Sequence, residues 1–212
     1  MKTPGDVKIA GSKTCKNWQA FRVKLVPGDD PGLWQDAFQS YFYERLFRRY
    51  LKPIEAIKKD GTLGGEGFSI VAIQCTLIEF LESTTKGLSY RYVDKHKGER
   101  LGKYEYSDSK KMFVNFLRKR PPFAKDFNKS LARDFYAGVR CGLLHEAQTK
   151  KGWTISADGP SGTVICAANK TVYRNNFQDG LRTFINWYRG ALPSDVSLQE
   201  AFIRKFDSLC QQ

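Results

Sequence analysis

Residues 68–81 read FSIVAIQCTLIEFL, and this stretch decides the fold class. It is apolar at nearly every position, and its length favours a buried helix over a strand. Gly87 is the residue type that ends such a helix. Gln74 and Glu79 lie inside the run. A carboxylate on so apolar a helix needs a partner, because unpaired buried charge is costly.

The sequence upstream of this helix predicts a second one. Asp30 offers an N-cap and Pro31 fits the first helical position. Apolar residues then recur at helical spacing until Pro53, which bends or ends the helix, and a further segment runs to about Lys59. Residues 1–30 lack clear periodicity, and residues 23–26 read as a short extended piece before a turn.

Downstream, the pattern alternates between helix and strand periods. It predicts helices over 110–120 and 126–148, a β-hairpin within 153–166 with 171–173 as a possible third strand, and two final helices. The chain is therefore predicted to be mainly α. The expected fold is a single domain over residues 1–212, an up-and-down helical bundle with a small β-hairpin insertion at about 152–173.

The composition fits a globular protein of the cytoplasm. The chain has 212 residues, 41% hydrophobic and 27% charged. No apolar run reaches the roughly 20 residues that span a membrane, and residues 1–16 lack the apolar core of a signal peptide. The five cysteines are widely spaced without a C-x-x-C pair, which favours reduced thiols over disulfides or a zinc site. We expect no metal and no cofactor.

The net charge of +13 is unevenly distributed. Residues 86–133 contain 14 Lys or Arg and 5 Asp or Glu, a net charge of +9. Such a field attracts polyanions. The alternatives are a surface that only confers solubility and an anionic membrane, although no basic amphipathic terminus is evident. Four cations on the helix over 110–120 are the expected phosphate ligands: Lys110, Lys111, Lys119 and Arg120.

The two histidines limit the choice of an acid or base. His96 lies among charged residues beside Gly98 and reads as a solvated loop residue. His145 lies near the end of a patterned helix, where its cation could simply complement the helix dipole. Arg140 lies within an otherwise apolar turn, and burying a guanidinium without an anion is costly.

Arg140 and His145 are five residues apart on the same predicted helix. Regular α geometry separates them by roughly 140° about the axis and about 7.5 Å along it. A long arginine side chain can still reach toward the histidine across Cys141 and Gly142. Because glycine is unfavourable inside a helix, Gly142 indicates that something packs closely there or that the helix loosens.

The run Arg140-Cys141-Gly142-Leu143-Leu144-His145 resembles the R-x(4–6)-H signature of the HEPN superfamily. The resemblance covers roughly residues 66–155 and includes Phe135-Tyr136, Glu146 and Trp153 around the motif. It also includes residues 76–81, Gly87 and the helix at 109–117. It implies a helical bundle, usually a two-fold dimer in which the motif helices face each other. Many members are endoribonucleases that need no metal.

The resemblance assigns roles to named residues. Arg140 would bind the scissile phosphate, because guanidinium matches phosphate in a bidentate manner. His145 would act on the ribose 2′-hydroxyl or the leaving oxygen, since an imidazole titrating near ~6.5 can both accept and donate a proton. Glu79 is singled out by its position on an apolar helix and not by the resemblance: it is expected to orient Arg140 or His145 from the neighbouring helix, or else to make a structural ion pair or hydrogen bond.

Two positions depart from the family pattern. Active members often carry a polar residue after the arginine, where this chain has Cys141. Toxins silenced by a nucleotidyltransferase antitoxin carry Tyr three residues after the histidine, and Gln148 here makes that partner less expected. Despite these departures, the resemblance implies a toxin or defence ribonuclease that binds RNA. The alternatives are a non-catalytic RNA-binding or scaffolding module and a protein-interaction domain.

Overall fold

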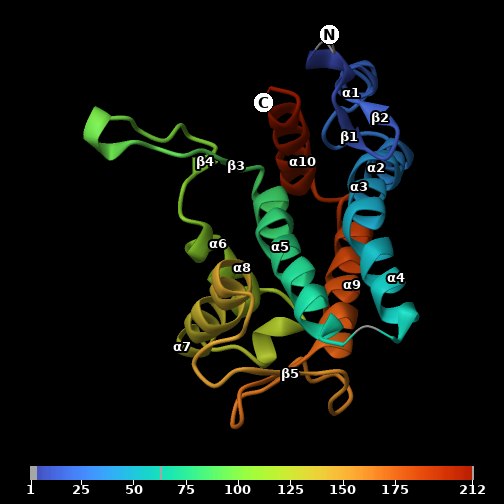
Figure 1. The fold of residues 1–212 in the computed structure, drawn as a ribbon. Helices are drawn as coiled ribbons and strands as arrows, with labels where there is room; N and C mark the ends of the chain where they lie inside the picture. The colour runs from blue at the N-terminus through green and yellow to red at the C-terminus, as the bar shows by residue number, and fades with distance from the viewer. Residues whose placement is uncertain (1–3, 63, 212) are drawn as a thin grey trace. The chain divides into compact units, whose positions relative to one another are not determined.

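The computed structural model describes residues 4–62 and 64–211, and these are mainly helical, as the sequence predicts (Figure 1). The described residues form two compact units. The first contains residues up to Lys52, Ser83–Ser109 and residues from Tyr188 onward, and the second contains Pro53–Glu82 and Lys110–Trp187. A single domain over residues 1–212 stays a prediction.

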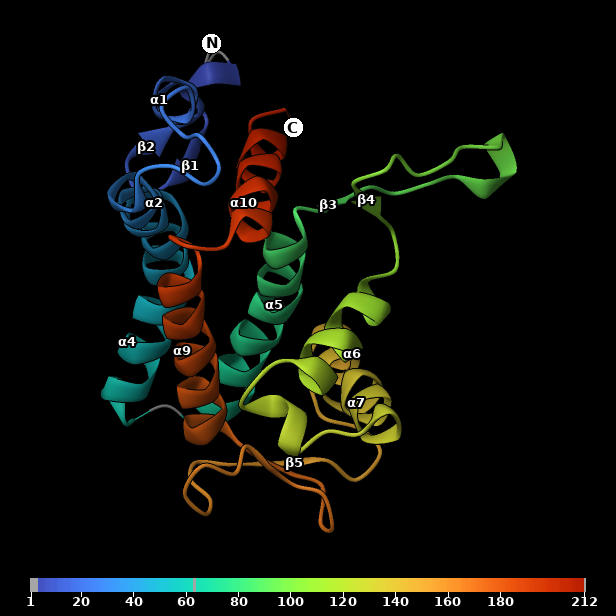
Figure 2. The ribbon, with the colours of Figure 1, turned by 180° about the vertical axis from the view of Figure 1, so that it is seen from behind.

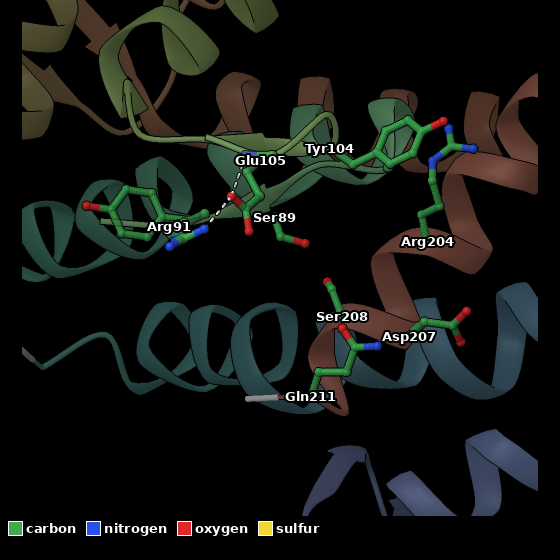
Figure 3. Close-up of a pocket in the computed structure, with 11 residues that line it drawn as sticks. Ser89, Arg91, Tyr104, Glu105, Arg204, Asp207, Ser208 and Gln211 are labelled. Atoms are coloured by element: carbon green, nitrogen blue, oxygen red, sulfur yellow. Dashed lines mark hydrogen bonds and ion pairs between the residues drawn. The ribbon is translucent and has the colours of Figure 1, made fainter. Parts of the chain in front are cut away.

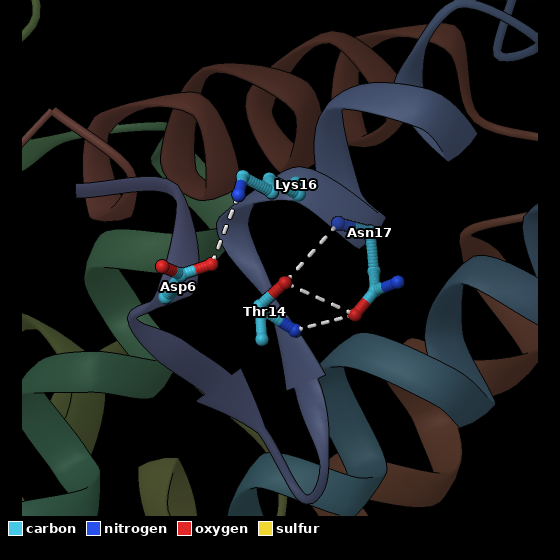
Figure 4. A network of polar contacts seen from close by, with 4 residues as sticks. All are labelled: Asp6, Thr14, Lys16 and Asn17. Atoms are coloured by element: carbon cyan, nitrogen blue, oxygen red, sulfur yellow. Dashed lines mark hydrogen bonds and ion pairs between the residues drawn. The ribbon is translucent and has the colours of Figure 1, made fainter. Parts of the chain in front are cut away.

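The first unit begins with a small antiparallel hairpin and a helix that the sequence did not predict. A 3-10 turn, η1 (Pro4–Asp6), precedes strands β1 (Lys8–Ala10) and β2 (Lys13–Thr14) and helix α1 (Cys15–Arg22). Thr14 caps α1, because its hydroxyl accepts from the Asn17 N–H while the Asn17 side chain accepts from the Thr14 N–H at 2.9 Å (Figure 4). Lys16 pairs with Asp6 at 3.0 Å beside this cap. The sequence did not predict α1, because a cap that involves Asn17 and one buried indole, that of Trp18, form no repeating apolar pattern.

The next helical run begins where the sequence predicts. Asp30 caps it by accepting from the N–H groups of Gly32 and Leu33, and Pro31 is its first residue. The run passes Pro53, whose missing N–H is tolerated in the first turn of the last segment. Its segments are α2 (Pro31–Ala37), the π-helical η2 (Phe38–Tyr43), α3 (Glu44–Leu46), the π-helical η3 (Phe47–Leu51) and α4 (Lys52–Asp60). From Pro53 onward, α4 belongs to the second unit.

The core of the first unit is aromatic. Trp18 is fully buried, its ring lies 5.3 Å from that of Phe206, and its indole N–H donates to Asp207 at 2.7 Å. The rings of Phe42 and Tyr188 are 4.9 Å apart. The other elements of the unit are β3 (Ser89–Tyr90), the 3-10 turn η4 (Lys95–Lys97), β4 (Glu105–Tyr106), α10 (Val196–Leu209) and the ends of α5 and α9.

The second unit is formed by helices around the predicted apolar one. The run at 68–81 lies within α5 (Glu66–Lys86), which ends at Gly87 with a positive φ of 63°. The other helices are α6 (Ser109–Lys119), η5 (Phe123–Lys125), α7 (Lys129–Phe135), the π-helical η6 (Tyr136–Arg140), α8 (Cys141–Glu146) and α9 (Arg174–Ala191).

A stack of aromatic rings fixes α6 and α9 against α7. Phe135 is fully buried and lies parallel to Phe177 of α9 at 5.7 Å. Phe113 of α6 lies 6.1 Å from Phe135 and 5.2 Å from Tyr136, measured between ring centres. The apolar faces predicted for these helices are therefore the faces that pack.

The β insertion exists, but the predicted pairing within Trp153–Cys166 is wrong. Strands β5 (Thr154–Ser156), β6 (Ile165–Cys166) and β7 (Thr171–Tyr173) form a sheet in the order β5-β7-β6. The hairpin is antiparallel β6–β7, and β5 pairs with β7 in parallel. Asn176 of α9 donates to carbonyls of the intervening loop, including Pro160 at 2.8 Å and Thr163 at 2.9 Å. This anchor holds the loop away from a tight β5–β6 turn.

Arg120 has a structural partner that the sequence did not reveal. Its Nε donates to the buried carboxylate of Glu82 at 2.8 Å, and its guanidinium lies 5.9 Å from the Trp187 ring. Only 1% of the Glu82 side chain is exposed. Arg120 is therefore already bound within the unit, unlike Lys119 beside it, which is exposed.

Replacing Arg120 should destabilise the protein because it removes this partner from a buried carboxylate. We expect Arg120→Ala to lower the free energy of unfolding by about 3 kcal/mol. Lys119→Ala, a neighbouring exposed cation, should change it by about 0.5 kcal/mol or less. Urea denaturation of both variants measures the difference. Equal stability of the two would contradict the importance of the Arg120–Glu82 pair.

Candidate active site

The predicted motif lies on one helix with an irregular centre. Asn128 caps α7 by accepting from the Leu131 N–H at 2.9 Å. The backbone then changes to π-helical bonding over Tyr136–Arg140 and returns to α-helix at Cys141. Such π segments occur frequently at functional sites. Val139 and Leu143 are buried, which fixes the rotation of the helix around Arg140.

Arg140 lies at the end of the π segment and is half-buried. Its guanidinium is 5.3 Å from the centre of the Tyr136 ring. Among the described residues, it makes no ion pair with a carboxylate. A half-buried guanidinium held against an aromatic ring in this way is suited to bind an anion.

Residues of α5 and the motif helix act on each other electrostatically. Burial raises the pKa of the Cys75 thiol to about 12. The charge of Arg140 lowers this pKa, whereas Cys141 raises it further. Burial also raises the pKa of Tyr136; Arg140 opposes this, whereas Cys141 and Glu79 add to it. Cys75 and Glu79 therefore lie on the side of α5 that influences this part of the motif helix.

His145 and Arg140 are brought onto one helix but not into contact. His145 is exposed and lies in the last turn of α8. No hydrogen bond joins these two side chains among the described residues. The pKa of the neighbouring Glu146 is lowered by its hydrogen bond with Lys150 and, to a smaller extent, by His145.

Two glycines let the chain fold back against the motif helix. A Cβ at Gly142 would lie 2.5 Å from the Gln148 carbonyl oxygen, and one at Gly138 would lie 2.5 Å from the Trp153 ring. Lys150 N–H donates to the Gly138 carbonyl at 2.7 Å. The expectation that something packs closely at Gly142 is therefore confirmed, and the packed segment is residues 147–153 of the same chain.

Asp134 is a positioning residue that the sequence did not reveal. The Trp153 indole donates to it at 3.0 Å, and Lys170 and Lys151 lie 3.0 and 3.7 Å away. Burial would raise the pKa of Asp134, but the bonds and charges of these partners lower it overall. Its partners are 17 to 36 residues distant, so spacing along the helix carried no signal for them.

The remaining predicted residues fall into two groups. Lys110, Lys111 and Lys119 are exposed on α6, whose Phe113 contacts Tyr136 of the motif helix. Arg120 is bound to Glu82 instead. A shallow apolar groove of about 240 Å³ lies beside the motif and is lined by Phe68, Ser69, Ala72, Leu143 and Ala147.

Comparison with known proteins gives no match: no family model matches the chain, and no curated protein or solved structure is significantly similar to it. Within the described residues, no cluster of three or more His, Cys, Asp or Glu side chains could hold a metal ion. No helix in the described part of the chain has the length and apolar character required to cross a membrane.

Adding a methyl group at Gly142 should loosen the segment that folds back on the motif helix. We expect Gly142→Ala to destabilise the protein by about 1–3 kcal/mol, because the new Cβ would collide with backbone. Gly190→Ala is the matched control, since nothing lies within 4 Å of its Cβ position in helix α9. That change should stabilise by up to about 1 kcal/mol. Thermal and urea unfolding compare them, and stabilisation by both would contradict the close packing.

Proposed function

We propose that this protein is a metal-independent endoribonuclease of the HEPN type, with Arg140 binding phosphate and His145 acting as general acid or base. One observation carries the proposal. A half-buried arginine without a carboxylate partner among the described residues lies five residues before an exposed histidine, on a helix whose position is fixed by packing. The net charge of +9 over residues 86–133 supports RNA as the polyanion.

In the proposed reaction, the 2′-hydroxyl of a ribose attacks the adjacent phosphorus. The 2′-hydroxyl loses a proton and the departing 5′-oxygen gains one; His145 makes one of these two transfers, as general base or general acid, and water makes the other. The P–O5′ bond breaks, giving a 2′,3′-cyclic phosphate and a 5′-hydroxyl, so atoms and charge balance without another reactant. Arg140 stabilises the negative charge that grows on the non-bridging oxygens.

Glu79 and Tyr136 would position Arg140 in this scheme. The Tyr136 ring supports the guanidinium, and Glu79 acts electrostatically on Tyr136 from α5. Both would therefore influence where the guanidinium points without touching the substrate. The three exposed lysines of α6 would bind flanking phosphates.

The proposal extends to the oligomeric state, the cellular compartment and the partners of the protein. A homodimer would bring two motif helices together, and the exposed Leu144 beside the apolar groove supports such contact. The protein would act in the cytoplasm as a toxin or in defence, and free cysteines suit that reducing compartment. With Gln148 after the motif, a nucleotidyltransferase antitoxin is not the expected partner.

A second candidate function is a non-catalytic RNA-binding or scaffolding module. The observation that favours it concerns Cys141, whose sulfur is hydrogen-bonded to the Tyr136 hydroxyl. The position after the arginine therefore offers substrate no strong polar group. RNA would then bind at the same cations without being cleaved.

Cleavage of labelled, unstructured RNA in EDTA distinguishes these functions. We expect the wild type to produce ends with a 2′,3′-cyclic phosphate. His145→Ala should reduce the rate about 10²–10⁴-fold, and Arg140→Ala about 10²–10³-fold. Mass spectrometry of the products identifies the ends.

The control is Arg189→Ala, which removes an exposed arginine from α9. It should cleave like the wild type from a matched preparation. Equal cleavage by wild type and His145→Ala would point to a contaminating nuclease. Absence of cleavage by the wild type, with salt-dependent binding intact, would reject catalysis in favour of the RNA-binding module.

A further inference from the structure

Residues 91–104 form an extended arm in the first unit. They leave β3 and return to β4, which pairs with β3 in parallel over Ser89–Tyr90 and Glu105–Tyr106 (Figures 1 and 2). The arm contains five Lys or Arg and two Asp or Glu. Most of its described residues are exposed. The arm is therefore a basic surface distinct from the motif helix of the second unit.

Tyrosines at the arm and its base are unusually exposed. The exposed fraction is 75% for Tyr92, 49% for Tyr90 and 42% for Tyr104. The Tyr92 ring packs against no other aromatic ring among the described residues. Proteins that bind single-stranded nucleic acid combine basic surface with exposed aromatic rings on which bases stack. The exposed Tyr92 ring beside the basic residues of the arm therefore has the features of such a stacking surface.

A pocket of about 510 Å³ lies at the base of the arm, between β3, β4 and α10. Ser89 and Ser208 approach it from opposite sides, and the Tyr104 ring covers the Arg204 guanidinium at 4.5 Å (Figure 3). This volume lies within the roughly 300–1,000 Å³ range of small-ligand sites. It is large enough for one nucleotide.

The walls of this pocket are held in place by backbone contacts. Gly87 has a positive φ, and a Cβ there would lie 2.7 Å from the Ala201 Cα and 2.8 Å from Arg204 Nε. The buried Lys205 donates to the Leu88 carbonyl at 3.0 Å. These contacts join the start of β3 to α10. The pocket is therefore largely formed before any ligand binds.

The charges of the pocket favour a nucleotide over an acidic peptide. Arg91 and Arg204 are balanced by Glu105 and Asp207, so the pocket does not select for a purely anionic ligand. Glu105 accepts from the Gly102 N–H at 2.7 Å and from Arg91 at 3.2 Å. A carboxylate in a fixed position can accept from amino groups of a base. The excess positive charge lies on the arm, where flanking phosphates would pass.

We propose that the arm and the pocket at its base bind single-stranded RNA, with one nucleotide in the pocket and a neighbouring base stacked on Tyr92. This inference rests on the proposed function for the identity of the polymer. It adds a binding site in the first unit, separate from Arg140 and His145. The arm would capture the strand, and the catalytic residues would act on another part of it.

The first test measures binding of a fluorescent 2′-O-methyl oligouridine of about ten nucleotides. This probe lacks a free 2′-hydroxyl, so the wild-type protein cannot cleave it. Tyr92→Ala should weaken binding about 5- to 100-fold through loss of stacking. Tyr92→Phe should restore it, because the ring remains. Unchanged affinity of Tyr92→Ala at about 50 mM salt would overturn the role of the arm.

The second test fills the pocket. Ser208→Trp should weaken binding of the same probe at least fivefold, whereas Val23→Trp places the same indole at a position that is 78% exposed and should not. Thermal unfolding midpoints confirm that each variant is folded. Equal binding by both tryptophan variants would overturn nucleotide occupancy of the pocket. Binding of polyglutamate in place of RNA, with the same dependence on Tyr92, would overturn the choice of RNA.

These outcomes are separable from those of the proposed function. If wild-type protein cleaves RNA through His145 while Tyr92→Ala binds normally, the inference fails and the ribonuclease proposal stands. If binding depends on Tyr92 but the wild type cleaves no RNA, the binding site stands and the catalytic proposal fails.

Discussion

The burial of α5 is the constraint on which both units depend. Glu66–Glu82 of this helix belong to the second unit and Ser83–Lys86 to the first. A helix that is apolar almost all round must be surrounded, and each polar group carried inside needs a partner. Glu82 finds Arg120, and the Gln74 amide donates to the side chain of Gln178 at 3.0 Å. Arg120 and Gln178 are thus already bound to α5.

The candidate active site also depends on close packing around a helix, here the shorter one that carries Arg140 and His145. Gly138 and Gly142 allow residues 147–153 to lie directly on the backbone of this helix. The Trp153 indole also donates a hydrogen bond to Asp134 of the same helix. A helix held so closely presents its remaining side chains in defined directions. Arg140 and His145 are among those that stay accessible. Rigid support of two chemically active side chains is what phosphoryl chemistry without a metal would require.

The sequence predicted the features that depend on residues close together in the chain. The apolar run at 68–81 gave α5, Asp30 with Pro31 gave a helix start, and glycine at 142 signalled close packing. The pairing of β7 between β5 and β6 was not predictable, since it depends on Asn176 and the loop that it anchors. The partner of Arg120 lies 38 residues away, so its charge was misread as available for phosphate. The positions of Arg140 and His145 on one helix were predicted, whereas the support from Asp134 was not.

If RNA phosphate binds between Arg140 and His145, as we propose, the imidazole rings report on it directly. The chain has two histidines, so the ring resonances of each can be assigned by NMR with a single substitution. Titration with an RNA oligonucleotide whose 2′-hydroxyls are methylated avoids cleavage during the measurement. We expect the His145 ring resonances and the Arg140 Nε–H resonance to move together and to saturate with RNA. Saturable RNA binding that leaves both unmoved would contradict it.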